Sequence, residues 1–293
     1  MKGTIIESAS NLYKIACENG DIFEASARGK LKQEEIIPVV GDKVEFLTLE
    51  EEGKAVIEKV EKRKVYIKRP KMANITQLIF VVSCENPKPD LLMLDKSLAF
   101  AEFVGTKAII VLNKTDLDKK YEFKKIKKIY ENIGYEVIET NAKDGTGVDK
   151  LIENLKNNTS SFSGNSGVGK STLINAIFKN EITQEGEISK KNKKGKNTTT
   201  STKLYEIEKN TYIADTPGFS TFNIEEIESK ELAKYFKEFK NYIKECEYVD
   251  CSHLKEQNCG IKKALEQGKI SQERYDRFCR IYQELKQKEK RNY

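Results

Sequence analysis

An eight-residue segment near the middle of the chain combines glycines, a lysine and a serine at a spacing that suits a polyphosphate. Residues Gly164–Ser171 match the pattern G-x-x-x-x-G-K-[ST]. The glycines let backbone N–H groups turn toward phosphate oxygens, Lys170 places a positive charge beside the β- and γ-phosphates, and Ser171 offers a hydroxyl to Mg²⁺. A helical pattern over Thr172–Phe178 follows directly, so the positive end of that helix faces the same anion. The segment predicts a nucleoside-triphosphate site.

A second segment, Asp215-Thr216-Pro217-Gly218, directly follows a predicted strand at Tyr212–Ala214. A carboxylate at the end of a strand can hold Mg²⁺ through water, and the N–H of Gly218 can meet a γ-phosphate. Alone, this tetrapeptide is typical of an ordinary turn. Because it comes after a phosphate-binding segment, it predicts a magnesium- and γ-phosphate-sensing loop.

Two further segments carry groups that can read a base. Asn113-Lys114-Thr115-Asp116 ends the apolar run Ala108–Leu112, and Asn141-Ala142-Lys143 follows one helix later. An Asp carboxylate accepts hydrogen bonds only, so Asp116 can accept from both the ring N–H and the amino group of guanine, a pair of donors that adenine lacks. Asn113 can meet O6 or N7, and the stem of Lys114 can lie along the base. The nucleotide is predicted to be GTP rather than ATP.

The only histidine of the chain lies among three cysteines. The spacing is Cys246-x₄-Cys251-x-His253-x₅-Cys259. Three sulfurs and one nitrogen suit tetrahedral Zn²⁺, and a complete protein shell predicts a structural site. The spacing differs from the common finger patterns. Three isolated cysteines are predicted to be small core residues: Cys17, Cys84 and Cys279.

The elements that position these residues fall into three groups. Up to about residue 69, short alternating runs predict five strands and a small barrel of the oligonucleotide/oligosaccharide-binding (OB) type, although an SH3-like barrel would look similar. From there to about residue 222, strands alternate with helices, which predicts parallel strands in an α/β sheet. The stretch before the phosphate segment, Thr159–Ser163, has a single large apolar residue, so the pattern leaves the extent of that strand open. The remainder is predicted to be helical. The expected strands are 3–6, 12–15, 21–25, 42–46, 55–57, 78–82, 108–112 and 212–214, and the expected helices are 92–104, 119–133, 148–157, 171–178, 225–244 and 271–291.

Composition excludes several classes of protein. The 293 residues are 38% hydrophobic, which is enough apolar material for packed cores, and the net charge is +6. The longest apolar runs are far too short for a bilayer, and the N-terminal residues lack the pattern of a signal peptide. We therefore expect a cytoplasmic protein without a membrane partner, and a monomer by default.

A lysine-rich stretch, Lys190–Lys196, precedes three consecutive threonines, Thr198–Thr200. By composition alone it is a solvated loop. Its place directly before the threonines allows contact with a phosphate backbone where the loop is extended, and an overall basic chain with an OB barrel makes a nucleic acid the expected polyanion. Tyr13 and Phe23 could stack on bases, although packing in the core is the better interpretation of each.

The order of the motifs is unusual. Ordinary GTPases place the phosphate loop first and the base loops last, whereas this chain has the base loops first, which predicts a circular permutation. On these motifs the chain resembles the ribosome small-subunit-dependent GTPase A family over essentially its whole length, including Ala73–Gln77 at the domain junction. The resemblance implies an OB barrel at residues 1–69, a permuted GTPase domain at 70–222 and a helical zinc-binding domain at 223–293.

The resemblance also assigns roles. It implies GTP or GDP, Mg²⁺, one structural Zn²⁺, and a small ribosomal subunit with its rRNA as partner. It implies that one threonine of the triplet completes the Mg²⁺ shell, and we expect Thr199. The predicted catalytic residues are Lys170, Thr199 and Gly218; the predicted Mg²⁺ ligands are Ser171 and Thr199; and the predicted zinc ligands are Cys246, Cys251, His253 and Cys259. The predicted nucleotide-binding residues are Asn113, Lys114, Thr115, Asp116, Asn141, Ala142, Lys143, Gly164, Asn165, Ser166, Gly167, Val168, Gly169, Lys170, Ser171, Thr172 and Asp215.

Two features predict slow intrinsic hydrolysis. Phe219 follows Gly218 where many GTPases have a glutamine that orients water, and the one histidine is assigned to zinc. A short connection from Gly218 to the zinc domain is expected to transmit the nucleotide state. The predicted function is a GTPase that assists late maturation of the small subunit, with subunit-stimulated hydrolysis driving release. The alternatives are an RNA-docking module in which GTP is only an occupancy signal and, less favoured, a P-loop ATPase or kinase.

Overall fold

The computed structural model describes residues 1–9, 11–29, 31, 35–185, 202–215, 222 and 224–291. The chain divides into two compact units, each built from separate stretches of sequence. The first comprises residues 1–79, 142–162 and 170–219, and the second comprises residues 80–141, 163–169 and 220–293. Among the described residues, no helix combines the length and apolar character needed to cross a bilayer.

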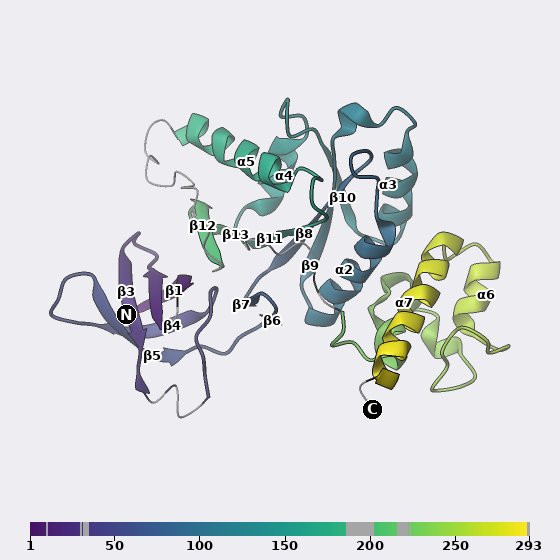
Figure 1. Cartoon of the computed structure of the whole chain (residues 1–293), viewed down its shortest axis with the longest axis horizontal. Helices are drawn as coiled ribbons and strands as arrows, with labels where there is room; N and C mark the ends of the chain where they lie inside the picture. Colours follow the sequence, from purple (N-terminus) through teal and green to yellow (C-terminus); the bar gives the residue numbers. More distant parts are fainter. Residues whose placement is uncertain are drawn as a thin grey trace. The chain divides into compact units, whose positions relative to one another are not determined.

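The first unit begins with a closed five-stranded barrel (Figure 1). Strand β1 pairs with both β2 and β4, β2 pairs with β3, and a parallel β3–β5 pair together with the antiparallel β4–β5 pair completes the ring. This Greek-key closure is that of an OB barrel. Alternate residues fill its core, among them Ile15, Phe46 and Tyr13, so Tyr13 is a core residue. The strands are β1 (Lys2–Ala9), β2 (Leu12–Ala16), β3 (Ile22–Ala27), β4 (Lys43–Thr48) and β5 (Lys54–Val60).

The rest of the first unit holds a hairpin and part of the α/β region. In the α/β part, β11 runs parallel to β13, with Ser161 opposite Ala214, and β12 is antiparallel to β13. The elements are β6 (Tyr66–Lys68), β7 (Lys71–Ala73), the start of β8 (Gln77–Ser83), α4 (Val148–Leu155), β11 (Thr159–Ser163), α5 (Lys170–Glu185), β12 (Lys203–Glu208) and β13 (Thr211–Asp215).

The second unit holds the remainder of β8 and the strands and helices that follow it. Strands β9 and β10 are parallel and in register, with Asn113 opposite Thr140. Helix α2 ends at Gly105, which has a φ of 74° and so adopts the left-handed conformation that glycine favours. The elements are α2 (Leu91–Val104), β9 (Lys107–Asn113), η1 (Thr115–Leu117), α3 (Glu122–Asn132) and β10 (Glu136–Thr140).

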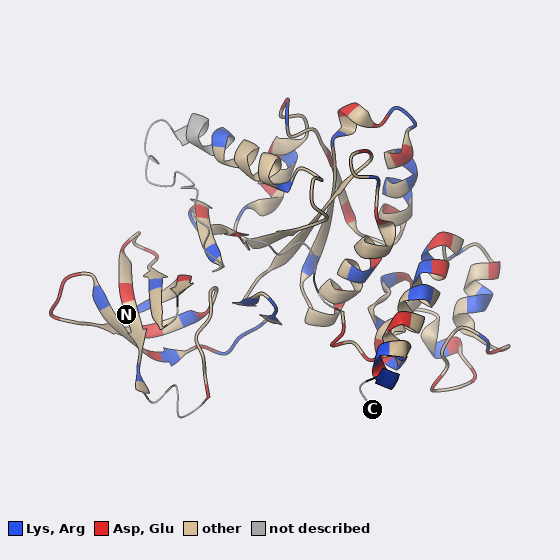
Figure 2. Ribbon diagram, in the orientation of Figure 1, with Lys and Arg blue, Asp and Glu red and all other residues tan. Residues whose placement is uncertain are grey.

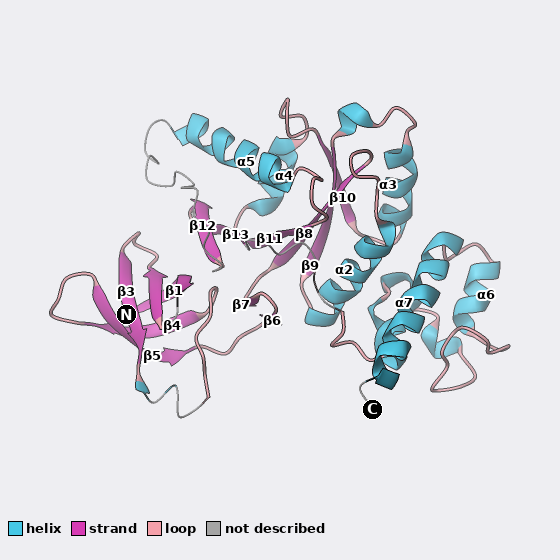
Figure 3. Cartoon of the chain, in the orientation of Figure 1, coloured by secondary structure: helices cyan, strands magenta, loops and turns pink. Residues whose placement is uncertain are grey.

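The C-terminal part of this unit shows helices and loops, and no strand among its described residues (Figure 3). The predicted helix over 225–244 is instead a series of three short 3₁₀ segments. Buried Phe236 and Phe239 pack their rings against Phe278, and this close aromatic contact favours a tight, irregular path for the backbone over a continuous α-helix. The elements are η3 (Ser229–Tyr235), η4 (Lys237–Phe239), η5 (Ile243–Glu245), α6 (Gly260–Glu266) and α7 (Gln272–Arg291).

Candidate nucleotide-binding and zinc sites

The strand that leads into the phosphate loop is complete. Strand β11 spans Thr159–Ser163, and its last four residues are buried. Small serines fit here because the strand is buried beside neighbouring strands. One of them, Ser160, is hydrogen-bonded in the interior: Gln77 Nε2 donates to Ser160 Oγ at 2.8 Å. The sequence left the extent of this strand open because only Phe162 is large and apolar.

The loop itself needs its glycines. Gly164, Gly167 and Gly169 have φ values of 145°, 81° and 98°. A Cβ on Gly164 would lie 2.3 Å from the carbonyl oxygen of Val81, and one on Gly169 would lie 2.3 Å from Asn113 Nδ2. The glycines therefore let the loop lie tightly against β8 and the base loop, which is the compact cradle that a polyphosphate requires.

Lys170 is the first residue of helix α5. Partial burial lowers the pKa of its ammonium group, so a bound phosphate would stabilise the charged form. Ser171 and Thr172 follow in the first turn and are exposed. An exposed first turn at a helix N-terminus has the hydroxyls and N–H groups that an anion and its cation need.

Asn113 ties the first base loop to the phosphate loop. Its side chain is 2% exposed; Nδ2 donates to the carbonyl oxygen of Val168 at 2.9 Å, and Oδ1 accepts from Thr140 Oγ1 at 3.0 Å. Lys114 has a φ of 66°, and its ammonium donates to the carbonyl oxygen of Asn86. Asn113 thus holds the loop that carries Asp116 against the phosphate loop, a role that the sequence pattern did not predict.

The carboxylate of Asp116 is exposed at the 3₁₀ turn Thr115–Leu117, and it has no bonding partner within the described part of the chain. The second base loop leaves strand β10 directly after Thr140. Asn141 and Ala142 are buried there, and Lys143 is exposed. Since β9 and β10 are parallel and in register, both base loops emerge at the same edge of the sheet.

Asp215 is the last residue of β13. Because β13 is parallel to β11, this carboxylate emerges at the edge of the sheet where β11 ends. The other residues predicted for this side of the nucleotide lie outside the described residues: Thr198, Thr199, Thr200, Gly218, Phe219 and the stretch Lys190–Lys196.

The loop between β8 and α2, residues 84–90, also contacts the phosphate loop, a contact that the sequence motifs did not predict. Asp90 caps α2 by accepting from Met93 N at 2.9 Å, and its second oxygen accepts from Asn165 Nδ2 at 3.4 Å. Pro87 lies 3.5 Å from the position of a Cβ on Gly167. A pocket opens between this loop, α2 and the phosphate loop, and Lys88 and Asp90 line it. The sequence signal was Asp90 directly before a helical pattern, a position typical of an N-cap.

The four predicted zinc ligands converge. All four donor atoms of Cys246, Cys251, His253 and Cys259 lie within 4.8 Å of one another. His253 Nδ1 lies 3.5 Å from the sulfur of Cys246 and 3.4 Å from that of Cys259, and these two sulfurs are 3.9 Å apart. A tetrahedral zinc shell with bonds of roughly 2.0–2.3 Å separates its ligand atoms by about 3.5–3.8 Å, so the cluster fits this metal.

The protonation chemistry of the cluster agrees with a cation site. Burial and neighbouring sulfurs raise the pKa of the Cys251 and Cys259 thiols, and burial lowers the pKa of His253, which keeps the imidazole neutral. A bound divalent cation would stabilise the thiolate form and so lower the pKa of these thiols. Burial of Glu256 opposes its ionisation, but hydrogen bonds from the Ser252 hydroxyl and from backbone N–H groups outweigh this and lower its pKa to about 2. This carboxylate holds the loop between the ligands by accepting from Ser252 Oγ at 2.7 Å.

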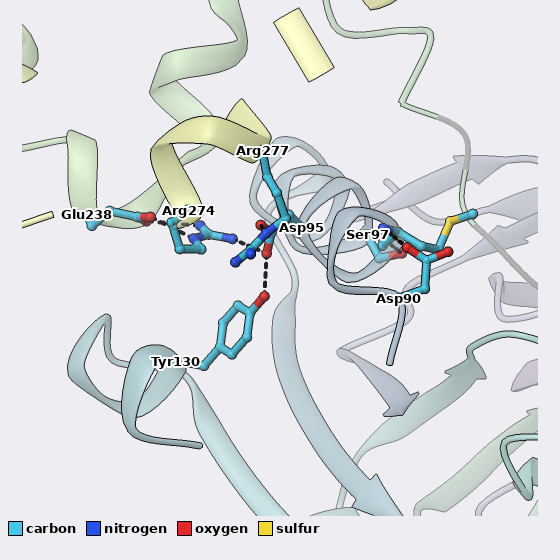
Figure 4. Close-up of polar contacts among 8 residues, drawn as sticks. Asp90, Asp95, Ser97, Tyr130, Glu238, Arg274 and Arg277 are labelled. Atoms are coloured by element: carbon cyan, nitrogen blue, oxygen red, sulfur yellow. Dashed lines mark hydrogen bonds and ion pairs between the residues drawn. The ribbon is translucent and has the colours of Figure 1, made fainter. Parts of the chain in front are cut away.

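A buried polar cluster joins helix α2 to helix α7 (Figure 4). Asp95, which is fully buried, accepts from Tyr130 Oη at 2.6 Å and from Arg274 and Arg277. Arg274 is 1% exposed and also pairs with Glu238, at 2.8 Å. The helix that Asp90 caps beside the phosphate loop is therefore also fixed to the C-terminal helix.

Comparison with known proteins agrees with this arrangement. The family described as RsgA GTPase matches residues 60–225, and the RsgA N-terminal domain matches residues 2–57. The chain is 38% identical to the small ribosomal subunit biogenesis GTPase RsgA of Clostridium botulinum (strain Kyoto / Type A2), over 100% of both chains. It is 38% identical to the protein of that name from Alkaliphilus metalliredigens, over 97% of this chain and 98% of the relative.

Two solved structures have the same fold. The crystal structure of YjeQ from Thermotoga maritima has a TM-score of 0.84 and 35% identity, and it covers 97% of this chain and 98% of its own. The structure of YloQ, described as a circularly permuted GTPase, has a TM-score of 0.81 and 28% identity, and it covers 98% of this chain and 95% of its own. The predicted order of an N-terminal barrel, a permuted GTPase and a helical C-terminal region is confirmed. The chain is a GTPase that belongs to the RsgA family.

Proposed function

We propose that this chain binds the small ribosomal subunit, assists a late step of its maturation, and leaves it when GTP is hydrolysed to GDP and phosphate. The relatives at 38% identity are named small ribosomal subunit biogenesis GTPases, and they align with the whole chain. The observation that supports the guanine-nucleotide part of the proposal is the direct bond between the two kinds of loop, from Asn113 Nδ2 to the Val168 carbonyl at 2.9 Å. A base loop early in the chain and a phosphate loop later in the chain thereby form one guanine-nucleotide site.

Each loop has a distinct task in this proposal. Backbone N–H groups of residues 164–169 bind phosphate oxygens, and Lys170 neutralises the β- and γ-phosphates. Asp116 reads the two donors of guanine. The remaining nucleotide contacts are proposed for Asn113, Lys114, Thr115, Asn141, Ala142, Lys143, Ser171, Thr172 and Asp215.

Two metal ions are part of the proposal. Ser171 and Thr199 would hold Mg²⁺ with Asp215 nearby; hydroxyl and carboxylate oxygens are the hard ligands that this ion prefers. When bound, Mg²⁺ neutralises charge on the phosphates. The four-residue cluster around His253 would hold Zn²⁺ in a closed shell, which stabilises the C-terminal region and takes no part in hydrolysis.

Hydrolysis by the protein alone should be slow. The single histidine lies 5% exposed in the cysteine cluster, so no imidazole is available as a general base. We propose that the ribosomal partner rearranges the site and positions the attacking water. The partner surface is proposed to include rRNA, because the chain is basic and carries an OB barrel.

The proposed organisation has an OB barrel at residues 1–69, the GTPase domain at 70–222 and the zinc domain at 223–293. The proposed working form is a cytoplasmic monomer.

The decisive experiment measures GTP turnover by the full-length protein with and without purified bacterial small subunits. Strong stimulation supports the proposal. Nucleotide-dependent binding without turnover would instead support an RNA-docking module in which GTP signals occupancy, and absence of both would refute the proposal. The variant Asp116→Asn tests the base: it should shift preference from guanine toward xanthine nucleotides, and an unchanged preference would favour an ATPase or kinase.

A further inference from the structure

The hairpin formed by β6 and β7 carries a dense run of positive charge within the described part of the first unit. Residues 62–84 contain no Asp or Glu, and strands β6 and β7 are largely blue in Figure 2. We call residues 62–73 the basic hairpin. Its cations are Lys62, Arg63, Lys64, Lys68, Arg69 and Lys71.

Most of these charges are not neutralised. Lys62, Lys64, Arg69 and Lys71 are exposed, and none has an acidic partner within the described residues. The neighbouring barrel differs: Lys54 pairs with Glu24 at 2.8 Å, as other exposed barrel cations pair with glutamates across strands. The ion pairs of that kind are Lys2–Glu61, Lys14–Glu7 and Arg28–Glu58. The positive surface of the basic hairpin is therefore a local departure from the pattern of the barrel.

The basic hairpin has a fixed backbone. Ile67 and Met72 are opposite one another in the hairpin, and both are buried. The side chain of Asn74 accepts from Lys64 N and donates to the Gly41 carbonyl, both at 2.9 Å, which joins the base of the hairpin to the barrel. A Cβ on Gly41 would lie 2.0 Å from the Ala73 carbonyl, so the two backbones are in contact.

Arg63 is the exception among the six cations. It donates to both oxygens of the fully buried Asp42 at 2.8 Å, and its guanidinium lies 4.6 Å from the centre of the Tyr66 ring. Arg63 therefore braces the hairpin, and the charges available to a ligand are those of Lys62, Lys64, Arg69 and Lys71.

The chemistry of this surface favours a phosphate backbone. Lysine and arginine side chains supply most sequence-independent contacts to nucleic acids, and a two-stranded ribbon is one of the elements that dock on them. A membrane-binding hairpin would present large apolar side chains beside its cations. Here the turn is Arg69-Pro70, and Tyr66, at 37% exposed, is the single exposed large apolar side chain of the described hairpin.

We propose that the basic hairpin contacts the sugar-phosphate backbone of RNA. The proposal deepens the proposed function, on which it rests for the source of that RNA, the small ribosomal subunit.

The test compares two full-length variants that lose equal charge. The first is Lys64→Gln/Arg69→Gln/Lys71→Gln, and the matched control is Lys2→Gln/Lys54→Gln/Lys59→Gln, whose lysines lie close to barrel glutamates. Affinity for a defined RNA stem-loop is measured by fluorescence anisotropy over a range of salt concentrations. Each lost phosphate contact reduces the salt slope by about 0.7–0.9, so the hairpin variant should lose about 2–3 in slope and bind at least roughly tenfold more weakly at low salt.

The control should lose less than about one unit of slope. Equal losses in the two variants, or an unchanged slope in the hairpin variant, would overturn the proposal. Equal binding of the parent to RNA and to polyglutamic acid, or binding to phosphatidylserine vesicles but not to RNA, would overturn it as well. The single variant Arg69→Glu, at the exposed turn, provides a second measurement if the triple variant unfolds, and it should weaken RNA binding.

The outcome is separable from that of the proposed function. Basal GTP turnover should be unchanged in the hairpin variant, because the basic hairpin lies outside the nucleotide loops. If small subunits fail to stimulate the parent, the proposed function fails, while the RNA affinities still decide the role of the hairpin. If subunits stimulate the parent and the hairpin variant binds RNA as the parent does, the hairpin proposal alone is refuted.

Discussion

Replacing Asn113 by alanine should weaken nucleotide binding and also destabilise the fold. The amide makes two buried hydrogen bonds, to the Val168 carbonyl and from the Thr140 hydroxyl. Each buried polar group that loses its partner costs about 1–3 kcal/mol. The two together predict a loss of about 2–4 kcal/mol, allowing for some relaxation and water entry. Since 1.4 kcal/mol is a factor of ten, GDP affinity should fall about 5- to 30-fold if half of the loss is expressed in the nucleotide site.

The assay pairs urea unfolding with titration of a fluorescent guanine nucleotide. Thr140→Val removes only the bond to Oδ1, so it should cost about 1 kcal/mol. The double variant should show a coupling of about 0.5–3 kcal/mol, because the two side chains share one bond. Asp116→Ala is the matched contrast. The Asp116 carboxylate is exposed, so this variant should lose affinity for the guanine nucleotide while its urea midpoint stays equal to that of the parent. If Asn113→Ala behaves like Asp116→Ala, with affinity lost and stability kept, the reasoning that Asn113 ties the loops together is wrong.

Three further predictions follow from individual contacts. Asp95→Ala should lower the free energy of unfolding by about 3–5 kcal/mol, because it leaves Arg274 buried with one partner fewer; a urea midpoint equal to that of the parent would contradict this. Gly169→Ala should abolish detectable nucleotide binding, since its φ of 98° and the 2.3 Å approach to the Asn113 amide both exclude a methyl group; titration with GDP checks it, and parental affinity would refute it. The thiol pKa values of Cys251 and Cys259 are raised in the folded protein, so zinc binding should release protons from them. Zinc affinity should therefore rise from about pH 6 to pH 8, as competition with a chromophoric chelator would show, and a pH-independent affinity would exclude thiolate ligation.

The sequence predicted the elements whose patterns are local. The five barrel strands follow short, broadly alternating runs, and the structure has all five within three residues of the expected bounds. Strand β11 was left open because Ser160 and Ser161 are buried through close packing, which a hydrophobicity pattern does not record. The C-terminal stretch 225–244 has helical periodicity but forms 3₁₀ segments, because long-range aromatic contacts determine its path. Tertiary packing overrode local preference in both places.

The candidate site shows the same division. Motif spacing indicated the phosphate and base loops, because their chemistry depends on residue type at fixed offsets. The tie through Asn113 and the contact of Asp90 with Asn165 could not be predicted, since each joins residues far apart in the chain. The four predicted zinc ligands lie within fourteen positions of sequence and were recognisable, although their convergence depends on the turn at His253, where φ is 63°.

Helix α2 contacts the phosphate loop, the C-terminal helix and Phe222. It therefore bears on how the connection after Gly218 could transmit the nucleotide state to the C-terminal region. Its N-terminus is capped by Asp90, which contacts Asn165 of the phosphate loop, and further along it Asp95 binds Arg274 of the C-terminal helix. Phe222, which follows Gly218 by four residues, stacks on Phe100 of the same helix with ring centres 5.0 Å apart. In an unpermuted GTPase the segment after Gly218 continues into the domain, whereas here it leads directly to the C-terminal region. The expected γ-phosphate contact at Gly218 would lie four residues before Phe222, and α2 carries both the stacking contact with Phe222 and the buried ion pairs to the C-terminal helix.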